Sequence, residues 1–141
     1  MKARDLMTAA PCCCTPDDSI QEVAQMMRDH DVGSVPVVES GQVIGIVTDR
    51  DLAVRALADG LYPGIRVRNV MTVAPDCCSE EDDVRDIERL MSDRQVRRVP
   101  IVNADGSVVG IIAQADLARA ASHGISSKEV SETVANISAP A

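Results

Sequence analysis

The segment "GQVIGIVTDRDLA" at residues 41–53 decides the fold, because the chain repeats it as "GSVVGIIAQADLA" at residues 106–118. Each copy reads as a strand rich in β-branched residues that runs directly into a helix start. Free backbone N–H groups at such a junction point outward and favour an anion. The segment therefore predicts two strand-to-helix junctions, each able to face a phosphate.

The repeat extends over most of the chain. "DLMTAAPCCCTPDDSI" at residues 5–20 matches "NVMTVAPDCCSEEDDV" at residues 69–84, and "VGSVPVV" at 32–38 matches "VRRVPIV" at 96–102. Each copy predicts an extended segment, a helix, two strands joined by a turn, and a second helix. We therefore expect an α+β protein with the order β-α-β-β-α, twice.

Helix caps support this order. Ser19 with Glu22 three residues later has the capping-box pattern, and Asp83 with Asp86 is a looser version of it. We place the first repeat at residues 2–62, the second at 63–121 and a tail at 122–141.

The composition excludes several classes of protein. The chain has 141 residues, 45% of them hydrophobic, a formal net charge of −8 and a single aromatic residue, Tyr62. An acidic chain without aromatic platforms is not expected to bind nucleic acid. No apolar run is long enough to cross a membrane, and the N-terminus lacks a signal peptide, so we expect a cytoplasmic protein.

The motifs together resemble the CBS domain, named after cystathionine β-synthase, in its tandem form, the Bateman module. The resemblance rests on "LMT" and "VMT", "TPDDSI", "VGSVPVV", "VRRVPIV" and, most specifically, "GIVTDRDLA", and it covers residues 2 to about 121. It implies two repeats packed around a pseudo-twofold axis, and a homodimer with the shape of a flat disk. It also implies an adenosine-containing ligand (AMP, ADP, ATP or S-adenosylmethionine) in the cleft between the repeats.

Candidate ligand-binding residues follow from the junctions and from the resemblance. Thr48 offers a hydroxyl to a phosphate, and Asp51 offers a carboxylate to two ribose hydroxyls. The resemblance implies that the opposite repeat supplies the adenine slot. The first predicted site therefore comprises Thr48, Asp51, Cys77, Cys78, Arg97, Arg98, Val99 and Pro100. The second comprises Cys13, Cys14, Val35, Pro36 and Asp116.

The two predicted sites are not equivalent. Ala113 stands where the first copy has Thr48, so the second junction loses one phosphate donor, while Asp116 remains. Arg97 and Arg98, placed in the first site by the resemblance, can form charge-assisted bonds to a phosphate. We expect the Asp51 site to be the stronger one. Two plainer interpretations stay open: Thr48 and Asp51 could only cap a helix, and the arginines could be solvated or paired with acidic residues.

We expect the cysteine runs at residues 12–14 and 77–78 to have a structural role rather than a redox or metal-binding role. Neighbours on an extended segment alternate faces, so we expect Cys14 and Cys78 in the core and Cys13 and Cys77 along a cleft. Adjacent thiols diverge, and no Cys-x-x-Cys spacing or histidine pair accompanies them, so we expect no metal site. His30 and His123 are single and predicted to be surface residues.

Three functions therefore compete. The first is a stand-alone regulatory module that binds an adenosine compound and signals to an unknown partner protein by changing conformation, with no cofactor required. The second is a stress-response or scaffold protein whose clefts are vestigial. The third is a thiol or metal sensor. No nucleophile–base pair or phosphate-binding loop indicates an enzyme. In the tail, Ile125, Val130, Val134 and Ile137 have the spacing of a short amphipathic helix.

Overall fold

The computed structural model describes residues 1–120 and 127–138, so His123 and Ile125 lie outside the described residues. The chain divides into two compact units. Unit 1 comprises Met1–Ala10, Asp76–Asp105 and Val109–Ala141, and unit 2 comprises Pro11–Pro75 and Gly106–Val108. Both units combine helices with a small sheet, which confirms the predicted α+β class.

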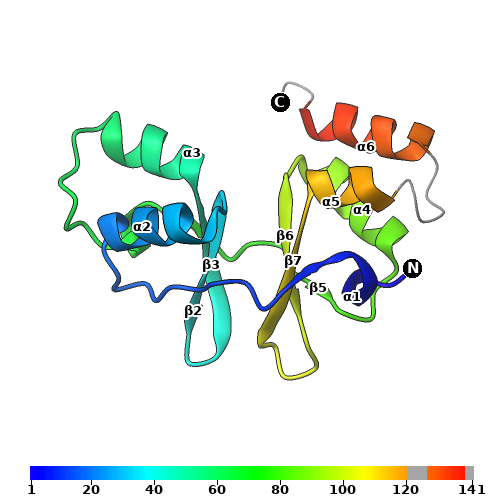
Figure 1. Ribbon diagram of the computed structural model, residues 1–141, viewed down its shortest axis with the longest axis horizontal. Helices are drawn as coiled ribbons and strands as arrows, with labels where there is room; N and C mark the ends of the chain where they lie inside the picture. The colour runs from blue at the N-terminus through cyan, green and yellow to red at the C-terminus, as the bar shows by residue number, and fades with distance from the viewer. Residues whose placement is uncertain (121–126, 139–141) are drawn as a thin grey trace. The chain divides into compact units, whose positions relative to one another are not determined.

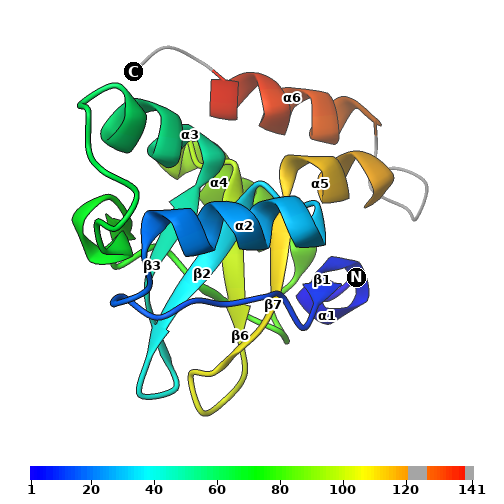
Figure 2. The ribbon, with the colours of Figure 1, turned by 60° about the vertical axis from the view of Figure 1, so that its left-hand side comes forward.

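Unit 2 is a three-stranded antiparallel sheet with helices (Figures 1 and 2). Helix α2 packs against β2 and crosses the strands in the view of Figure 2. Its cap is the predicted capping box, in which the Ser19 hydroxyl accepts from the Glu22 N–H at 3.1 Å. The sheet order is β2-β3-β4. The elements are α2 (Ile20–His30), β2 (Ser34–Glu39), β3 (Gln42–Thr48), α3 (Asp49–Asp51), η1 (Leu52–Leu57), η2 (Val67–Asn69) and β4 (Thr72–Val73).

Unit 1 repeats this plan and adds two helices. Its four-stranded sheet has the order β1-β7-β6-β5. The elements are α1 (Ala3–Leu6), β1 (Thr8–Ala9), β5 (Cys78–Ser79), α4 (Val84–Arg94), β6 (Arg98–Val102), β7 (Val108–Ala113), α5 (Gln114–Ala120) and α6 (Ser127–Ser138). The cap of α4 is not the predicted looser capping box, because the Asp83 carboxylate accepts from Arg85 N–H at 2.9 Å.

The start of each sequence repeat completes the sheet of the other repeat. Strand β1 pairs antiparallel with β7, with Thr8 opposite Ile111, and β4 pairs antiparallel with β3, with Thr72 opposite Ile46. The compact units therefore divide the chain differently from the repeats at residues 2–62 and 63–121.

Two glycines make room for these exchanged segments. A Cβ atom on Gly110 would lie 2.2 Å from Sδ of Met7, and one on Gly45 would lie 2.6 Å from Sδ of Met71. A side chain at either position would therefore force the methionine to move from its place. The glycine of the repeated segment is thus a packing site for the methionine of the opposite repeat.

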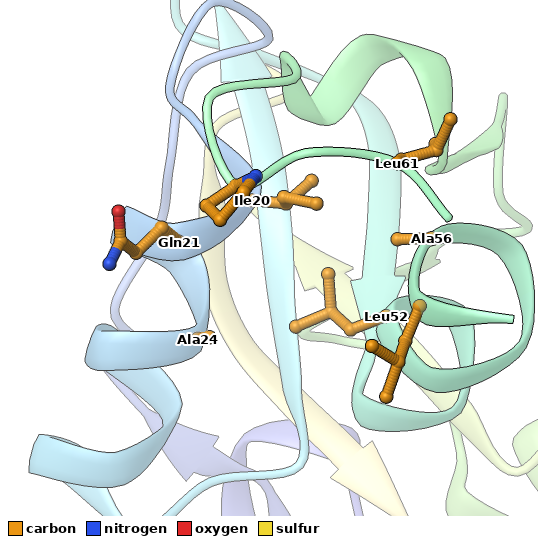
Figure 3. Close-up of a pocket in the computed structure, with 8 residues that line it drawn as sticks. Ile20, Gln21, Ala24, Leu52, Ala56 and Leu61 are labelled. Carbon is orange, nitrogen blue, oxygen red and sulfur yellow. The ribbon is translucent and has the colours of Figure 1, made fainter. Parts of the chain in front are cut away.

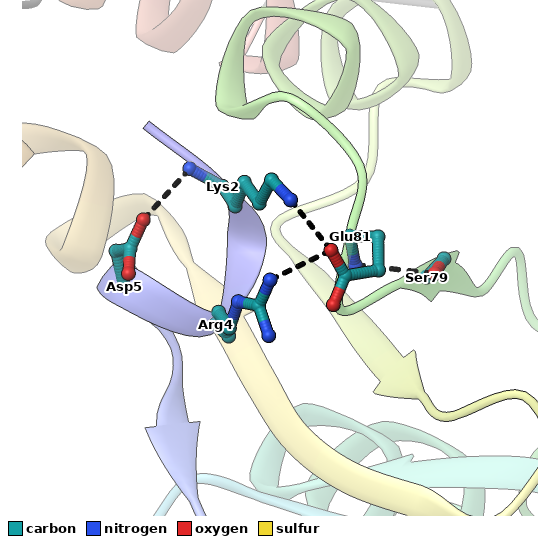
Figure 4. Close-up of polar contacts among 5 residues, drawn as sticks. All are labelled: Lys2, Arg4, Asp5, Ser79 and Glu81. Carbon is teal, nitrogen blue, oxygen red and sulfur yellow. Dashed lines mark hydrogen bonds and ion pairs between the residues drawn. The ribbon is translucent and has the colours of Figure 1, made fainter.

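Ion pairs at aligned positions of the two repeats connect the start of each repeat to the other repeat. In unit 1, Glu81 accepts from Lys2 and Arg4, both at 2.7 Å (Figure 4). In unit 2, Asp17 pairs with Arg66 at 3.4 Å and also with Arg68. These pairs are solvent-exposed, so each contributes little to the stability of its unit.

Each unit has its own hydrophobic core of aliphatic side chains, as expected for a chain without Phe or Trp. The buried residues of unit 2 are Cys14, Ile20, Val23, Met27, Val35, Val37, Val47, Ala56, Val67 and Val70. Those of unit 1 are Ala3, Cys78, Val84, Ile87, Met91, Val99, Ile101, Ile112, Leu117, Ala120, Val130 and Ile137.

Candidate functional site

Thr48 and Asp51 form a reciprocal capping box where β3 meets α3. The Thr48 hydroxyl oxygen accepts from Asp51 N–H at 3.1 Å, and Asp51 Oδ2 accepts from Thr48 N–H at 2.9 Å. The plainer interpretation, a helix cap, is therefore part of the answer. A threonine that accepts through its oxygen still has its hydroxyl proton to donate, so capping and phosphate binding are compatible.

The backbone N–H groups of this junction are not free, and the prediction that they would face an anion is wrong. Asp49 N–H donates to Gly33 O at 3.0 Å, and Arg50 N–H donates to Asp49 Oδ1 at 2.9 Å. Asp51 N–H donates to Thr48 Oγ1. The physical reason is that the helix end satisfies its own orphan donors through caps and a neighbouring carbonyl.

Asp51 is nearly buried, with 12% of its side chain exposed, and its second oxygen, Oδ1, lies 3.5 Å from Nε of Arg55. Arg55 also donates to the carbonyl of Val70 at 3.3 Å, which fixes the guanidinium. A carboxylate oxygen has more than one lone pair, so Oδ1 retains capacity to accept from a hydroxyl group.

The helix that follows Asp51 widens into a π-helix, η1. Ala58 N–H donates to Ala53 O, and Leu61 N–H donates to Ala56 O, each at 3.0 Å and five residues back. Turns of this width are rare and are frequently found at functional sites. The corresponding helix of unit 1, α5, is a regular α-helix.

At the second junction, in unit 1, the carboxylate is more buried than that of Asp51. Asp116 Oδ2 accepts from Ala113 N–H at 2.7 Å, and Asp116 Oδ1 is ion-paired with Arg119. Only 5% of the Asp116 side chain is exposed. Because Ala113 has no hydroxyl, this junction has only one of the two capping hydrogen bonds and lacks the hydroxyl donor that Thr48 provides in the first junction.

The remaining residues of the first predicted site lie together in unit 1. Cys78 of β5 pairs in parallel with Ile101 of β6, the strand that contains Arg98, Val99 and Pro100. Val99 is fully buried in the core of the unit. Arg97 is exposed and Arg98 half-buried. Neither side chain is in an ion pair with any described residue.

The remaining residues of the second predicted site lie together in unit 2. Cys14 N–H donates to Pro36 O at 3.0 Å, and Val38 N–H donates to Cys14 O at 2.8 Å. Cys13 is half-buried, whereas Val35 is fully buried in the core of the unit. Both predicted sites combine residues from unit 1 with residues from unit 2, so the complete sites remain predictions.

The cysteines are placed as expected with respect to the cores. Cys14 and Cys78 are buried, Cys12 and Cys13 are half-buried, and Cys77 is exposed. Burial raises the pKa of Cys14 to about 12, that of Cys78 to about 11 and also that of Cys13. The pKa of Cys77 is raised by the partial desolvation of its thiol, although the residue is exposed, and by the charge of Asp76. Protonated thiols are poor nucleophiles and poor metal ligands. Over residues 1–120 and 127–138, no three His, Cys, Asp or Glu side chains are grouped to hold a metal ion.

Two features of these surfaces were missed in the sequence. The first is the ion pairing of Asp51 with Arg55 and of Asp116 with Arg119. The spacing of four and three residues is that of ion pairs on a helix, so the sequence could have predicted both pairs. The other feature is an apolar groove of about 210 Å³ in unit 2, between α2 and η1 (Figure 3). It is lined by Ile20, Gln21, Ala24, Leu52, Ala56, Leu57, Leu61 and Pro63. The predicted surface position of His30 is confirmed.

The repeats, the junctions and the fold agree with one family model, that of the CBS domain, which matches residues 3–57 and again residues 67–123. The chain belongs to the CBS domain family. This confirms the resemblance inferred from the repeated motifs, and a CBS domain pair is a tandem arrangement of two such repeats.

Curated relatives cover most of this CBS domain protein. It is 39% identical over 115 residues to CBS domain-containing protein YhcV of Bacillus subtilis, covering 82% of this chain and 81% of YhcV. It is 34% identical over 121 residues to Hypoxic response protein 1 of Mycobacterium tuberculosis, covering 83% of this chain and 82% of the relative.

Solved structures of CBS domain pairs share the fold. A structure of Hypoxic Response Protein I with two coordinated zinc ions is 31% identical, with a TM-score of 0.76, and covers 84% of this chain and 98% of that chain. CBSX2 in complex with AMP is 27% identical (TM-score 0.73; 86% and 96% covered). The CBS domain pair of MJ0100, in complex with 5-methylthioadenosine and S-adenosyl-L-methionine, is 26% identical (TM-score 0.79; 89% and 98% covered). In the part of the chain that the structure describes, no helix has the length and apolar character needed to span a bilayer.

Proposed function

We propose that this CBS domain pair is a regulatory module that binds an adenosine-containing ligand, AMP, ADP, ATP or S-adenosylmethionine, and signals to a partner protein by a conformational change. The observation that carries the proposal is the junction of Thr48 and Asp51, where a donor hydroxyl and a nearly buried carboxylate lie side by side. We propose no catalytic role and no required cofactor, and a cytoplasmic location.

Each residue of the junction has a stated task in this proposal. Asp51 accepts from one ribose hydroxyl through Oδ1 and from the other through the second lone pair of Oδ2, which stays bonded to Thr48 N–H. The Thr48 hydroxyl proton is donated to a phosphate oxygen. Since the backbone N–H groups are already bonded, the phosphate charge is met by Arg97 and Arg98, whose side chains are not engaged in ion pairs with described residues. The Cys77–Cys78 and Val99–Pro100 segments supply the adenine slot.

Ligands of related structures support the chemical class. AMP and S-adenosyl-L-methionine, found with CBSX2 and with the MJ0100 pair, share an adenosine group and differ in charge. An adenosine group needs a ribose acceptor and an adenine slot, whereas only a phosphate needs Thr48 and the arginines. We therefore infer a preference for nucleotides over S-adenosylmethionine at the Asp51 site.

The Asp116 site is proposed to be the weaker one. Its carboxylate is ion-paired with Arg119 and more buried than Asp51, and Ala113 provides no hydroxyl. Binding of a ribose there would have to compete with the Arg119 contact. Cys13, Cys14, Val35 and Pro36 complete this second site.

A metal-binding function is the second candidate, because the structure of Hypoxic Response Protein I contains two coordinated zinc ions. The raised pKa values of Cys13, Cys14, Cys77 and Cys78 oppose it, since zinc requires deprotonated thiols. A scaffold role with vestigial clefts is the third. The module is proposed to act as a homodimer.

Isothermal titration calorimetry with AMP, ADP, ATP, S-adenosylmethionine and zinc tests the proposal. Asp51→Asn keeps an acceptor for Thr48 N–H and removes the charge, so we expect it to weaken nucleotide binding at least tenfold. Asp116→Asn is the matched control and should leave the stronger binding event unchanged. No heat with any adenosine compound at millimolar concentration would refute the nucleotide proposal, and saturable zinc binding would favour the metal candidate.

A further inference from the structure

Arg55 of η1 contacts the candidate ligand carboxylate and, at the same time, backbone that is distant in sequence. Its Nε lies 3.5 Å from Asp51 Oδ1, and one terminal nitrogen, Nη1, donates to the carbonyls of Val70 at 3.3 Å and Met71 at 3.4 Å. The two carbonyls are 15 and 16 residues further along the chain. A guanidinium has several N–H donors in one rigid plane, so a single side chain holds both partners.

These carbonyls lie at the start of the segment by which the chain leaves unit 2. This exit segment, residues 70–75, contains the two-residue strand β4 and is followed by Asp76, the first residue of the next stretch of unit 1. Two of its amides report on its attachment: Met71 N–H donates to Val67 O and Ala74 N–H donates to Ile44 O, both at 3.0 Å. Because a strand of this length is shorter than most, charge-assisted hydrogen bonds at its start help to hold it in place.

The second repeat has a different residue at the position of Arg55. Ala120 is aligned with Arg55, and it is buried in the core of unit 1. Asp116 is paired with Arg119, which is aligned with Val54. The helix that contains Arg55 is the π-helix η1, whereas α5 is regular. An arginine at this position is therefore a feature of the first repeat alone.

A ribose bound at Asp51 would compete with Arg55 for the same oxygen. Each hydroxyl that donates to the carboxylate occupies a lone pair and disperses part of its charge, so the carboxylate holds the guanidinium less firmly. The Arg55 side chain is 53% exposed. It can therefore turn into solvent once this anchor weakens, and it regains rotamer entropy when it does so.

We propose that Arg55 couples occupancy of the Asp51 site to the exit segment. Without ligand, the guanidinium bridges Asp51 and the carbonyls of Val70 and Met71; a bound ribose releases it and loosens the segment. The inference rests on the proposed adenosine-containing ligand and names the residue through which unit 2 responds to it. Linkage is reciprocal, so a ligand that loosens the segment binds more tightly when the segment is already loose. Arg55 is thus a positioning residue, which acts on the ligand through Asp51.

Amide hydrogen exchange in the ligand-free chain, followed residue by residue by NMR, tests the link. Arg55→Met removes the donors and keeps a long side chain. Asp51→Asn keeps an acceptor for Thr48 N–H and removes the charge that anchors Arg55. In both variants we expect the amides of Met71 and Ala74 to exchange about threefold faster, because the exit segment opens more often.

Two controls separate this local effect from a general one. Arg119→Met, at the ion pair of the second junction, should leave both rates unchanged. The amide of Val38, which is bonded elsewhere in unit 2, should keep its rate in every variant. Wild-type rates for the exit segment in Arg55→Met would overturn the link. Equal acceleration at Val38 would show that Arg55 stabilises the unit as a whole, and would also overturn it.

Adenosine is the ligand probe, because it has the ribose hydroxyls and no phosphate that Arg55 could attract. Saturating adenosine should speed exchange at Met71 and Ala74 about threefold in the wild type and have no effect there in Arg55→Met. By reciprocity, an NMR titration should show that Arg55→Met binds adenosine about threefold more tightly than the wild type.

The ligand experiment separates the coupling from the proposed function. If Arg55 has only a structural role, adenosine will change the exchange rates equally in the wild type and in Arg55→Met, which would overturn the coupling. Adenosine or AMP that binds the wild type without changing the rates of the exit segment overturns the coupling alone. A wild type that binds neither compound overturns the coupling together with the proposed function.

Discussion

Substituting Gly110 by alanine should destabilise the protein through a side chain that belongs to the opposite sequence repeat. The new Cβ atom would lie 2.2 Å from Sδ and 2.7 Å from Cγ of Met7. Inserting a methyl group into a packed position costs about 1–3 kcal/mol. At an m-value of about 2 kcal/mol/M, a loss of about 2 kcal/mol lowers the urea midpoint by about 1 M.

A double-mutant cycle identifies the partner of Gly110. Met7→Ala removes the clashing atoms, so the Gly110→Ala substitution should cost little in a Met7→Ala background, with a coupling energy of about 1–2 kcal/mol. Met71→Ala is the control, because Met71 packs on Gly45 instead. Rescue by Met71→Ala, or none by Met7→Ala, would refute the exchange of segments between repeats. Urea unfolding followed by circular dichroism measures all of these variants.

Two further predictions concern titratable groups. Burial, with Glu129 nearby, raises the pKa of Glu88 on α4, and Glu88 Oε1 has no hydrogen-bond partner among the described residues. The folded state therefore keeps this proton to a higher pH than the unfolded chain, and stability is lost as the pH rises through the raised pKa; Glu88→Gln should remove this loss and raise the melting temperature at pH 7. With thiols whose pKa is about 12 and about 11, Cys14 and Cys78 should resist alkylation at pH 7.5, whereas the exposed Cys77 should react first, as measured by mass spectrometry of the native protein.

Each of these has a contradicting outcome. Equal pH dependence of thermal unfolding in the wild type and in Glu88→Gln would show that Glu88 is ionised at no cost in the folded state. Labelling of Cys14 at the rate of Cys77 would show that the first extended segment is open to solvent.

Much of the fold could be predicted from the repeat. Ser19 and Glu22 predict the start of α2, and the aligned valine-rich segments predict the paired strands. Cys14 and Cys78 are buried because alternation on an extended segment places every second residue inward. Helix caps, strand composition and alternation depend on residues that are close in sequence, so a single sequence is enough to predict them.

The exchange of segments could not be predicted, because strands β1 and β4 are two residues long and their sequences, "TA" and "TV", do not specify a partner strand. At the candidate site, Thr48, Asp51 and their possible role as a helix cap were predicted, but the acceptors that bind the backbone N–H groups of the junction were not. Free N–H groups were expected where Gly33 O, Asp49 Oδ1 and Thr48 Oγ1 accept instead. Which acceptor reaches a donor depends on packing, which periodicity does not encode.

Pairing of β1 with β7 also sets the order in which the molecule can be completed during translation. Unit 2 lies almost wholly within Pro11–Pro75, so it can close its sheet once β4 has left the ribosome. The first ten residues are made before all of it, yet their partner strand is Val108–Ala113. At about 10 residues per second, the segment that contains β1 is synthesised roughly 10 s before its partner strand β7, and during that time Met7 and the rest of that segment remain accessible to chaperones and proteases.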